Sequence, residues 1–539
     1  MKTVIFLSLI MFAFTLCFSQ NIYFSGSVDQ GTVWDYDTVF LEGNVNIPED
    51  IILEIAPGTK IIAEGYYRIE AYGCILALGN VQDTIVFTVA DKTDFADTAQ
   101  YEAGGWDGIH FLPSTCSDSS LFEYCKFSYG KAVKPDNNSG GAVLITNRNN
   151  IEFYNCTFEY NMCLEYGGAI YSNSTNLISY CKFVLNRTYE HGGAIAFKAE
   201  NIEPIIANCE FIKNIAMNHE DDGSWLFRWG NGAGVYISTN NSPDSMPQVI
   251  NNMFFANSYI AIYESCYNIL IANNLIINNW YAYMNGMSIG NQKFINNTLS
   301  GNENTNLEIN NPDLVIRNNI IYNVVGAWDF SPNNDTTIFW FPSNPTNLSY
   351  SNVQYNYFIN YEGVISEDPQ FVNSLPAPDP IVFPQYVLNI ETTTIPVLNF
   401  ELADFDYSLI DESTCINAGI PDTSLLNIPA NDFLGNPRVY GGRIDMGAIE
   451  NQYVIWDNIE PNSKQLSLYP NPAADWIFVQ IEAYNVDIEI TDINGRVLIS
   501  DKLTSSVIDI SHLPEGMYIV KLNTGKEIIT EKFFKEGNN

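Results

Sequence analysis

The chain has 539 residues, of which 46% are hydrophobic and 14% aromatic, and its 62 acidic and 24 basic residues give a formal net charge of −38. A chain of this length and apolar content can fill a large core and more than one domain. The charge argues against nucleic acid and anionic membranes as partners, because phosphate groups are bound by lysine and arginine. Cationic partners, divalent ions and neutral glycans remain compatible with it.

Residues 1–19 have the pattern of a secretory signal peptide. One lysine precedes an apolar run from Val4 to Phe14, and Cys17 and Ser19 place small residues at the two sites that a signal peptidase reads. The run is too short for a membrane anchor, and no later segment has the ~18 uninterrupted apolar residues that would span a bilayer. We therefore expect an exported chain that begins near Gln20 and has no transmembrane segment.

Residues 39–127 consist of short apolar stretches interrupted by glycine and proline, which is typical of strands separated by turns. The stretches Leu53–Ile61 and Gly73–Ala77 resemble the N-terminal coils of the right-handed parallel β-helix, or pectate-lyase-like, superfamily. The segment Gly104–Phe111 continues this resemblance. Its Asp107 and His110 lie in a recurrent turn and strand, so we interpret them as structural residues rather than as an acid and base pair.

Two further motifs recur between residues 140 and 257. Gly-Gly-Ala-Val or Gly-Gly-Ala-Ile begins at Gly140, Gly167 and Gly192, and Phe-x-x-Asn begins at Phe158, Phe183, Phe211 and Phe254. Together they resemble the repeats of the chlamydial polymorphic outer membrane proteins, which are β-helical surface adhesins. The resemblance covers about four coils and implies a passenger-like scaffold.

The most regular repeat is an Asn-Asn pair between Val249 and Asn323. Its second asparagine advances by 22, 23 and 22 residues, from 252 to 274, 297 and 319. A period near 22 indicates one coil of a β-solenoid. Identical amides one strand spacing apart, ~4.8 Å, can hydrogen-bond in a ladder. A second asparagine ladder in the same phase is predicted at Asn161, Asn186, Asn214, Asn257, Asn279 and Asn302.

Cysteine fills the first asparagine slot in the earlier coils, at Cys125, Cys156, Cys181 and Cys209. We predict an inward stack of small apolar side chains, since free cysteine packs like a small hydrophobe. Disulfides between adjacent coils are the alternative, because stacked Cα atoms fall within bonding range. Metal binding ranks below both, because the chain has no Cys-x-x-Cys pair.

One coil is longer than its neighbours. The interval from Phe-x-x-Asn to the next glycine motif is 6 residues from 161 to 167 and from 186 to 192, but 18 from 214 to 232. Insertions in a regular solenoid are common places for function. We predict a ligand site on this insertion, formed by His219, Trp225, Arg228 and Trp229, whose tryptophans suit the apolar faces of sugars. Calcium is the one candidate cofactor, with oxygen ligands from Glu220, Asp221 and Asp222. A solvated acidic loop pinned by tryptophan is the alternative.

The sequence offers no defined catalytic geometry. A polysaccharide lyase or glycosidase of this fold would need paired carboxylates, or a basic residue beside calcium carboxylates. Glu190-His191-Gly192-Gly193 only partly matches a Gly-His-Gly motif, and the arginines of the coils share no phase with acidic pairs. We expect a non-catalytic adhesin, scaffold or glycan-binding protein that contacts an extracellular glycan or a host or surface protein. The alternative is a secreted polysaccharide lyase or glycoside hydrolase.

After residue 365 the repeat ends. Residues 366–455 resemble the closing segment of bacterial β-helix surface proteins, sometimes called a choice-of-anchor region. It contains four charged residues, which we interpret as paired charges that cap the open end of the solenoid rather than as a catalytic cluster: Asp432, Arg438, Asp445 and Glu450.

Residues 456–465 are predicted to be a linker to a second domain. Residues 466–539 alternate as strands, and Asn494-Gly495 is a strong hairpin turn, so we predict a small β-sandwich of about seven strands. Leu466–Ala473, Val486–Val497 and Ile508–Val520 closely resemble the type A C-terminal sorting domain of the type IX secretion system. The resemblance implies export across the outer membrane by that machinery. The expected fold is therefore all-β: a right-handed parallel β-helix over residues 20–365, its closing region, and this β-sandwich.

Overall fold

The computed structural model describes residues 20–452 and 467–536, apart from residues 117, 136, 217–229, 240–244, 288, 303–305, 323–338, 341–346, 355–357, 376–404, 425, 481–485, 493–494, 504–506 and 524–527. The chain divides into two compact units between Tyr453 and Val454. The predicted signal peptide and linker lie outside the described residues. The described residues contain no helix that is long and apolar enough to cross a membrane.

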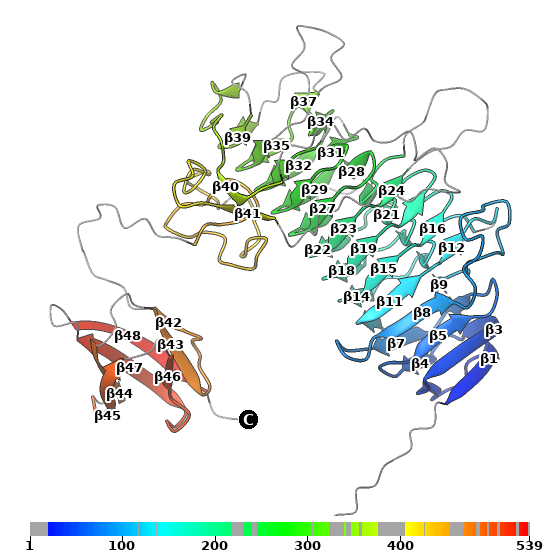
Figure 1. The fold of residues 1–539 in the computed structure, drawn as a ribbon, viewed down its shortest axis with the longest axis horizontal. Helices are drawn as coiled ribbons and strands as arrows, with labels where there is room; N and C mark the ends of the chain where they lie inside the picture. The colour runs from blue at the N-terminus through cyan, green and yellow to red at the C-terminus, as the bar shows by residue number, and fades with distance from the viewer. Residues whose placement is uncertain are drawn as a thin grey trace, which may run out of the picture. The chain divides into compact units, whose positions relative to one another are not determined.

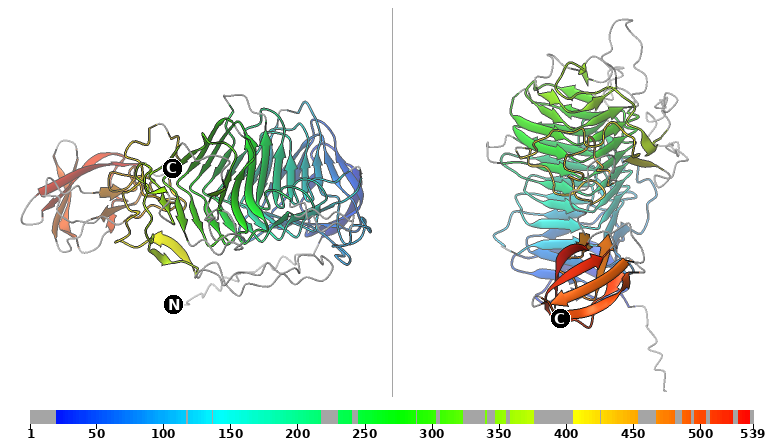
Figure 2. Two further views of the ribbon diagram at one scale, coloured as in Figure 1. Left: turned by 90° about the horizontal axis from the view of Figure 1, so that it is seen from above. Right: turned by 90° about the vertical axis from the view of Figure 1, so that its left-hand side faces the viewer.

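The first unit is a parallel β-helix in which each coil contributes strands to three stacked faces (Figures 1 and 2). Two of these faces are ladders of one 23-stranded sheet, and they diverge from the long strand β3 (Thr38–Ile47). The third face is a separate 12-stranded sheet. The strand pairs on the three faces are parallel, as the repeat predicts, and the register is continuous within each pair except for a shift between Phe24 and Gly26 in the first pair, β1 (Asn21–Ser27) with β3.

The first ladder, here called the phenylalanine ladder, consists of β1 (Asn21–Ser27), β3, β5 (Lys60–Ala63), β8 (Ile85–Val89), β11 (Cys125–Ser128), β15 (Thr157–Glu159), β19 (Lys182–Val184), β23 (Glu210–Ile212), β27 (Met253–Phe255), β30 (Leu275–Ile277), β33 (Thr298–Ser300), β36 (Ile320–Tyr322) and β39 (Asn352–Val353).

The second ladder, here called the tyrosine ladder, consists of β6 (Ile69–Ala71), β9 (Ile109–Phe111), β13 (Val143–Ile145), β17 (Ile170–Ser172), β21 (Ile195–Lys198), β25 (Val235–Thr239), β28 (Ile260–Cys266), β31 (Tyr281–Asn285), β34 (Leu307–Ile309) and β37 (Phe339–Trp340).

The 12-stranded sheet contains β2 (Val33–Trp34), β4 (Ile52–Ile55), β7 (Cys74–Leu78), β10 (Ser120–Glu123), β14 (Ile151–Tyr154), β18 (Leu177–Ser179), β22 (Ile205–Ala207), β26 (Gln248–Ile250), β29 (Asn268–Ala272), β32 (Asn291–Ile295), β35 (Val315–Arg317) and β38 (Leu348–Ser349). A short parallel sheet joins the two ladders in four coils and contains β12 (Lys131–Ala132), β16 (Met162–Cys163), β20 (Arg187–Thr188) and β24 (Ile215–Ala216).

The interior is filled by stacked identical side chains. Phe127, Phe158 and Phe183 lie ring over ring, with centroids 4.7 and 4.9 Å apart, and the same stack continues to Phe211 and Phe254. Each ring is fully buried, and all but Phe127 belong to a Phe-x-x-Asn motif. The repeat therefore places one aromatic ring per coil at the same point of the core, where offset stacking adds to burial.

Both predicted asparagine ladders are present. In the first, the Nδ2 atoms of Asn252, Asn274 and Asn297 donate to Oδ1 of the next asparagine at 3.1, 2.9 and 3.2 Å. In the second, Asn161, Asn186, Asn214, Asn257 and Asn279 do the same at 2.9 to 3.2 Å. The residue before each slot has positive φ, as at Asn273 (φ 56°) and Asn296 (φ 55°), a conformation that asparagine tolerates at turns.

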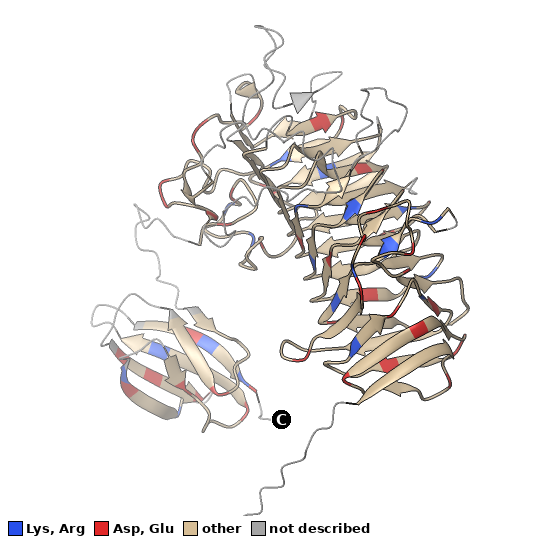
Figure 3. Ribbon diagram, turned by 45° about the vertical axis from the view of Figure 1, so that its right-hand side comes forward, with Lys and Arg blue, Asp and Glu red and all other residues tan. Residues whose placement is uncertain are grey.

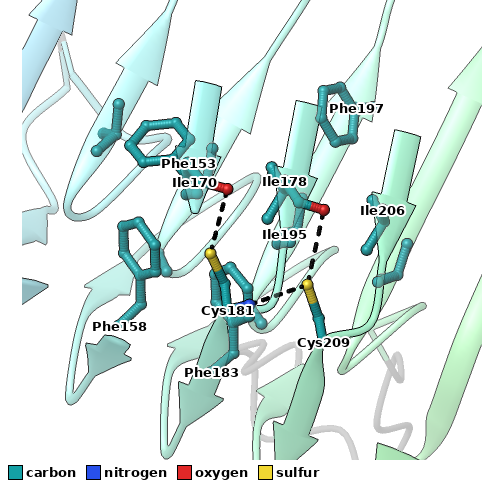
Figure 4. Close-up of a cluster of buried hydrophobic side chains, with 14 of the residues drawn as sticks. Phe153, Phe158, Ile170, Ile178, Cys181, Phe183, Ile195, Phe197, Ile206 and Cys209 are labelled. Atoms are coloured by element: carbon teal, nitrogen blue, oxygen red, sulfur yellow. Dashed lines mark hydrogen bonds between the residues drawn. The ribbon is translucent and has the colours of Figure 1, made fainter. Parts of the chain in front are cut away.

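The cysteine stack is confirmed as a row of buried thiols. Cys125, Cys156, Cys181 and Cys209 are each about 1% exposed and form no disulfide with one another. Their sulfur atoms donate to backbone carbonyls inside the helix, as Cys181 does to Phe153 O at 3.5 Å and Cys209 to Ile178 O at 3.6 Å (Figure 4). The thiols thus take the interior position that the first asparagine ladder occupies in later coils.

The glycine pairs permit close contact between coils. The first glycine of each pair has positive φ, as at Gly167 (φ 72°) and Gly192 (φ 73°). A Cβ added to Gly168 would lie 2.1 Å from the carbonyl oxygen of Gly193 in the next coil. A Cβ added to Gly193 would lie 2.5 Å from the carbonyl oxygen of Ala233. A side chain at Gly168 or Gly193 would therefore force these coils apart, which explains the Gly-Gly pairs there, whereas the next coil has Ala233 at the equivalent position.

The closing segment packs along the side of the coils, not on their open end, so the predicted position of the charge cluster is wrong. Asn296 Nδ2 donates to Asp445 O at 3.1 Å, and the backbone N of Ala448 donates to Thr298 Oγ1 at 2.9 Å. Ile449 packs with outward apolar residues of β27 and β30, and Leu426 with those of β29 and β32. The reason is that these coils have apolar outer surfaces, which the segment covers. It also contains the antiparallel pair β40 (Phe371–Asn373) and β41 (Asp406–Leu409).

The second unit is a seven-stranded antiparallel β-sandwich, as predicted. One sheet contains β42 (Ser467–Tyr469), β43 (Trp476–Gln480) and β46 (Val507–Asp509), and the other contains β45 (Val497–Leu503), β44 (Val486–Asp492), β47 (Gly516–Asn523) and β48 (Ile528–Lys535). Ile490, Val520 and Phe533 are at the centre of its own apolar core. β44 and β45 form the predicted hairpin, in which Gly495 has φ 82° and donates its N–H to Asp492 O.

Candidate functional site

The predicted ligand and calcium residues lie outside the described residues. These are His219, Glu220, Asp221, Asp222, Trp225, Arg228 and Trp229, so both site predictions remain predictions. Among the residues that are described, no group of three or more histidine, cysteine or acidic side chains could hold a metal ion.

The two ends of that insertion are described: its C-terminal end lies against Glu190 and His191 of the preceding coil, and its N-terminal end, at Ala216, lies beside Gly230 and pairs with Thr188. A Cβ on Gly230 would be 1.7 Å from the carbonyl oxygen of Glu190 and 2.9 Å from Ala216. The backbone N–H of Asn231 donates to Nδ1 of His191 at 3.0 Å. The insertion therefore leaves and re-enters the solenoid beside His191.

His191 belongs to a continuous group of aromatic side chains on the outer surface of the tyrosine ladder, here called the tyrosine face: Tyr166, Tyr171, His191, Tyr236 and Tyr263. Strand register explains why they gather. Tyr171 pairs with Ala196, Ala196 with Tyr236, and Tyr236 with Tyr263. Because side chains in register point to the same side, these four positions share one outward row.

Ala196 leaves a gap in that row which two turn residues fill. The His191 ring is stacked on Tyr236 with centroids 4.8 Å apart and an interplanar angle of 10°. Tyr166 lies 5.6 Å from His191 and 5.9 Å from Tyr236. Tyr236 and Tyr263 are stacked at 5.2 Å. The result is an aromatic surface across four consecutive coils, with its rings held by one another.

Lys198 supplies the positive charge of the tyrosine face. Its Nζ atom is 4.0 Å from the Tyr166 ring centroid and donates to the Tyr166 hydroxyl at 2.6 Å. The side chain is otherwise exposed. A lysine fixed against an aromatic ring in this way presents its remaining donors to solvent or to a ligand.

His191 is neutral at physiological pH. Burial lowers its pKa to about 4, and the nearby charge of Lys198 contributes in the same direction. Because Nδ1 accepts the Asn231 N–H, the proton of the neutral ring is assigned to Nε2. Near this ring the pKa of the Glu190 carboxyl is raised, first by burial and then by the charge of Glu165. The tyrosine face therefore combines ring surfaces, hydroxyls, one neutral imidazole donor, one ammonium group and two carboxylates.

Asp107 and His110 are held in a buried structural network, in keeping with their interpretation from sequence. Asp107 accepts hydrogen bonds from Asn137 Nδ2 at 2.5 Å and Tyr66 at 3.1 Å, and its other oxygen is 3.3 Å from Arg68. His110 is 5% exposed, and burial lowers its pKa. Neither side chain has the solvent access that substrate would need.

Lys131 is another buried charged residue with a structural role, and it was not predicted from the sequence. It is fully buried, and its ammonium donates to the carbonyls of Asp97, Gln100 and Ala103 at 2.7 to 3.0 Å, with Asp94 O at 3.4 Å. These acceptors recur every three residues in the loop that follows β8. The lysine therefore ties this loop to the coil of β12.

The tyrosine face was not predicted from the sequence. A signal for it was present, because a tyrosine follows the glycine motif at the same phase in Gly-Gly-Ala-Ile-Tyr171 and Gly-Ala-Gly-Val-Tyr236. What the sequence could not show is that Tyr166 and His191, two turn residues, fold over Ala196 and join that row.

The fold and the comparison with known families identify an exported β-helical protein. Residues 102–258 match the family model described as right handed beta helix region, and residues 467–536 match the model of the secretion system C-terminal sorting domain. The first unit is thus a right-handed parallel β-helix, and the second is a type IX sorting domain. That domain directs the protein across the outer membrane, to the extracellular space or the cell surface. No curated protein is matched by the chain.

Proposed function

We propose that the β-helix is a non-catalytic binding module, an adhesin or scaffold that holds an extracellular glycan along the tyrosine face. The observation that carries the proposal is the in-register row Tyr171, Tyr236 and Tyr263, with Lys198 fixed over Tyr166. Tyr236 is only 8% exposed between its two stacked neighbours, so the partly exposed Tyr171 and Tyr263 would supply the apolar ring contact, and their hydroxyls the polar contact, for a sugar. Because the row runs along successive coils of the β-helix, the tyrosine face suits an extended ligand.

The mixed charges around the tyrosine face favour a ligand that is recognised by aromatic contacts and hydrogen bonds rather than by its net charge. In the view of Figure 3, lysine and arginine on the described coils are spread among acidic residues. On the tyrosine face itself, the ammonium of Lys198 is offset by Glu165 and Glu190, both of which are only partly exposed. A neutral or weakly acidic glycan fits this balance better than a polyanion does.

The test is an array of purified glycans probed with the exported protein, with and without calcium. Retention and the appearance of new reducing or unsaturated ends are measured together. We expect retention without cleavage. Replacing Tyr171 or Tyr263 with alanine should weaken retention roughly fivefold each, since one aromatic contact contributes about 1 kcal/mol.

Tyr180→Ala is the matched control, because Tyr180 is a tyrosine 60% exposed at a turn outside the tyrosine face. Retention unaffected by Tyr171→Ala and Tyr263→Ala would rule out this face as the site. Loss of retention in a Trp225→Ala, Trp229→Ala double variant would extend the site onto the insertion. Cleavage that disappears on replacing Asp221 and Asp222 would instead favour the polysaccharide lyase or glycoside hydrolase alternative.

A further inference from the structure

Two cysteines outside the interior stack approach each other. The sulfur atoms of Cys74 and Cys116 are 3.4 Å apart, although 42 residues separate them in the chain. Cys74 begins β7 and is fully buried, whereas Cys116 lies in the loop between β9 and β10 and is partly exposed. This loop is therefore held with its thiol directly against the coil before it.

Neighbouring contacts fix both partners. The carboxylate of Glu49 accepts three hydrogen bonds from this loop. The donors are the backbone N–H of Thr115 at 2.7 Å, the hydroxyl of Thr115 at 2.6 Å and the hydroxyl of Ser114 at 3.0 Å. On the other side, Arg148 donates to Tyr72 O at 2.6 Å and Gly73 O at 3.2 Å. The loop and the turn before β7 are thus anchored independently of the two sulfurs, which brings the thiols together without a covalent bond.

We propose that Cys74 and Cys116 are a redox modification site, which closes to a disulfide when the protein meets the oxidising environment outside the cytoplasm. Export is established by the sorting domain, and disulfides form and persist in such compartments. The bond would link the turn before β7 to the loop before β10 and so fasten adjacent coils near the N-terminal end.

The reaction proceeds by thiol and disulfide exchange with an external disulfide, either a low-molecular-weight disulfide or that of a dithiol oxidase. The accessible Cys116 thiolate attacks one sulfur of that disulfide, forming a mixed disulfide and releasing one thiol. Cys74 then loses its proton and attacks the Cys116 sulfur, releasing the second thiol. Two protein thiols are oxidised, and one external disulfide is reduced to two thiols.

Access explains why this pair reacts and the interior stack does not. Cys125, Cys156, Cys181 and Cys209 are about 1% exposed and donate to interior carbonyls, so no external oxidant reaches them in the folded protein. The Cys74 sulfur has a guanidinium nitrogen of Arg148 at 3.7 Å, which stabilises the thiolate that forms in the second step. Burial raises the pKa of Cys74 to about 11, so this second step should accelerate as the pH rises.

The first experiment maps thiols in the full-length exported protein, collected from the outside of the cell. The protein is denatured, alkylated without reduction, digested and examined by mass spectrometry. We expect seven of the nine cysteines of the described chain to be alkylated, and the peptides containing Cys74 and Cys116 to be joined until a reductant is added. Alkylation of both Cys74 and Cys116 without reduction would overturn the proposal, and so would a link of either one to another cysteine.

A second experiment uses reduced protein and oxidised glutathione. Cys74→Ser should accumulate a glutathione adduct at Cys116, because the resolving thiol is missing, whereas Cys116→Ser should form no adduct at Cys74. Cys163→Ser is the control, since Cys163 is buried with its sulfur 3.3 Å from a hydroxyl of Thr188, and it should leave closure of the pair unchanged. If Cys74→Ser fails to fold, Cys116→Ser still decides the matter, because a cross-linked Cys74 in that variant would contradict the pairing.

Discussion

The side-chain amide of Asn297 donates to Asn319 Oδ1 at 3.2 Å, and its backbone N–H donates to the same oxygen at 2.8 Å. The oxygen of each ladder amide thus accepts from the coil before it, and its backbone and side-chain nitrogens donate to the coil after it, while Nδ2 also donates to a carbonyl of the coil before, as Asn297 does to Ile271 O at 3.0 Å. Asn297 Oδ1 in turn accepts from both nitrogens of Asn274 at 2.9 Å. All of these groups are fully buried, so their hydrogen bonds have no solvent replacement.

Replacing Asn297 with leucine should lower the free energy of unfolding of the β-helix by about 3 kcal/mol. The substitution leaves the backbone N–H of Asn274 without its acceptor and removes a donor from Asn319, and each buried unpaired group costs about 1 to 3 kcal/mol. Equilibrium denaturation followed by circular dichroism measures the loss. Asn149→Leu, at an exposed turn, is the control and should change stability far less. Identical unfolding of Asn297→Leu and wild type would contradict the role assigned to the ladder.

Glu264 should make the β-helix more stable in mild acid than at pH 8. Its carboxyl is fully buried inside the helix and accepts from Tyr283 at 2.9 Å, Asn285 at 2.5 Å and the Cys266 N–H at 2.8 Å, all neutral donors. Burial raises its pKa from 4.5 to about 7, against the lowering effect of these hydrogen bonds.

The folded state binds this proton more tightly than the unfolded state does. The stabilising contribution of the protonated Glu264 carboxyl is therefore fully present below pH 4.5 and is lost as the pH rises through about 7, which lowers the free energy of unfolding by roughly 3 kcal/mol. The measurement is the free energy of unfolding between pH 4.5 and 8 for wild type and Glu264→Gln. Subtracting the Glu264→Gln profile from the wild-type profile removes the contributions of the other groups that titrate in this pH range. A difference that does not change with pH would show that Glu264 does not titrate there.

Replacing Arg438 with methionine should destabilise the docked closing segment by about 3 to 5 kcal/mol, because it leaves a buried charge without its partner. Arg438 is 1% exposed, lies 3.2 Å from a Glu450 oxygen and donates to Ala448 O at 3.0 Å. Limited proteolysis of residues 405–452 reports release of the segment. Lys182→Met removes one member of the exposed Lys182–Glu210 pair and should cost under about 1 kcal/mol. Equal effects of the two substitutions would argue against a buried ion pair.

Deleting residues 466–539 should leave a folded β-helix that accumulates in the periplasm. The two units have separate apolar cores, and the removed residues contain the sorting domain. Cell fractionation with a protease-accessibility assay distinguishes periplasmic from surface-exposed protein. Circular dichroism of the truncated chain checks that it is folded, and its normal display at the surface would contradict the assigned role of the domain.

The sequence by itself determined the architecture of the solenoid. Asparagine that recurs every 22 or 23 residues, with cysteine and phenylalanine at the equivalent positions of the longer earlier coils, specifies one coil, because only stacking places identical side chains at one strand spacing. Both asparagine ladders, the cysteine stack and the hairpin of the C-terminal sandwich could therefore be assigned before any coordinates were known. These features depend on local spacing, and the chain displays local spacing directly.

Tertiary structure alone decided which residues from different repeats and segments meet. Tyr166 and His191 join the tyrosine row only because Ala196 leaves space between Tyr171 and Tyr236. The charge cluster around Arg438 lies beside Asn296 and Thr298, about 150 residues earlier in the chain, because the outer surfaces of those coils are apolar. Cys74 and Cys116 likewise meet through the path of a loop that has no repeat. Contacts of this kind follow from packing between coils and irregular segments, and the periodicity of the sequence does not predict such packing.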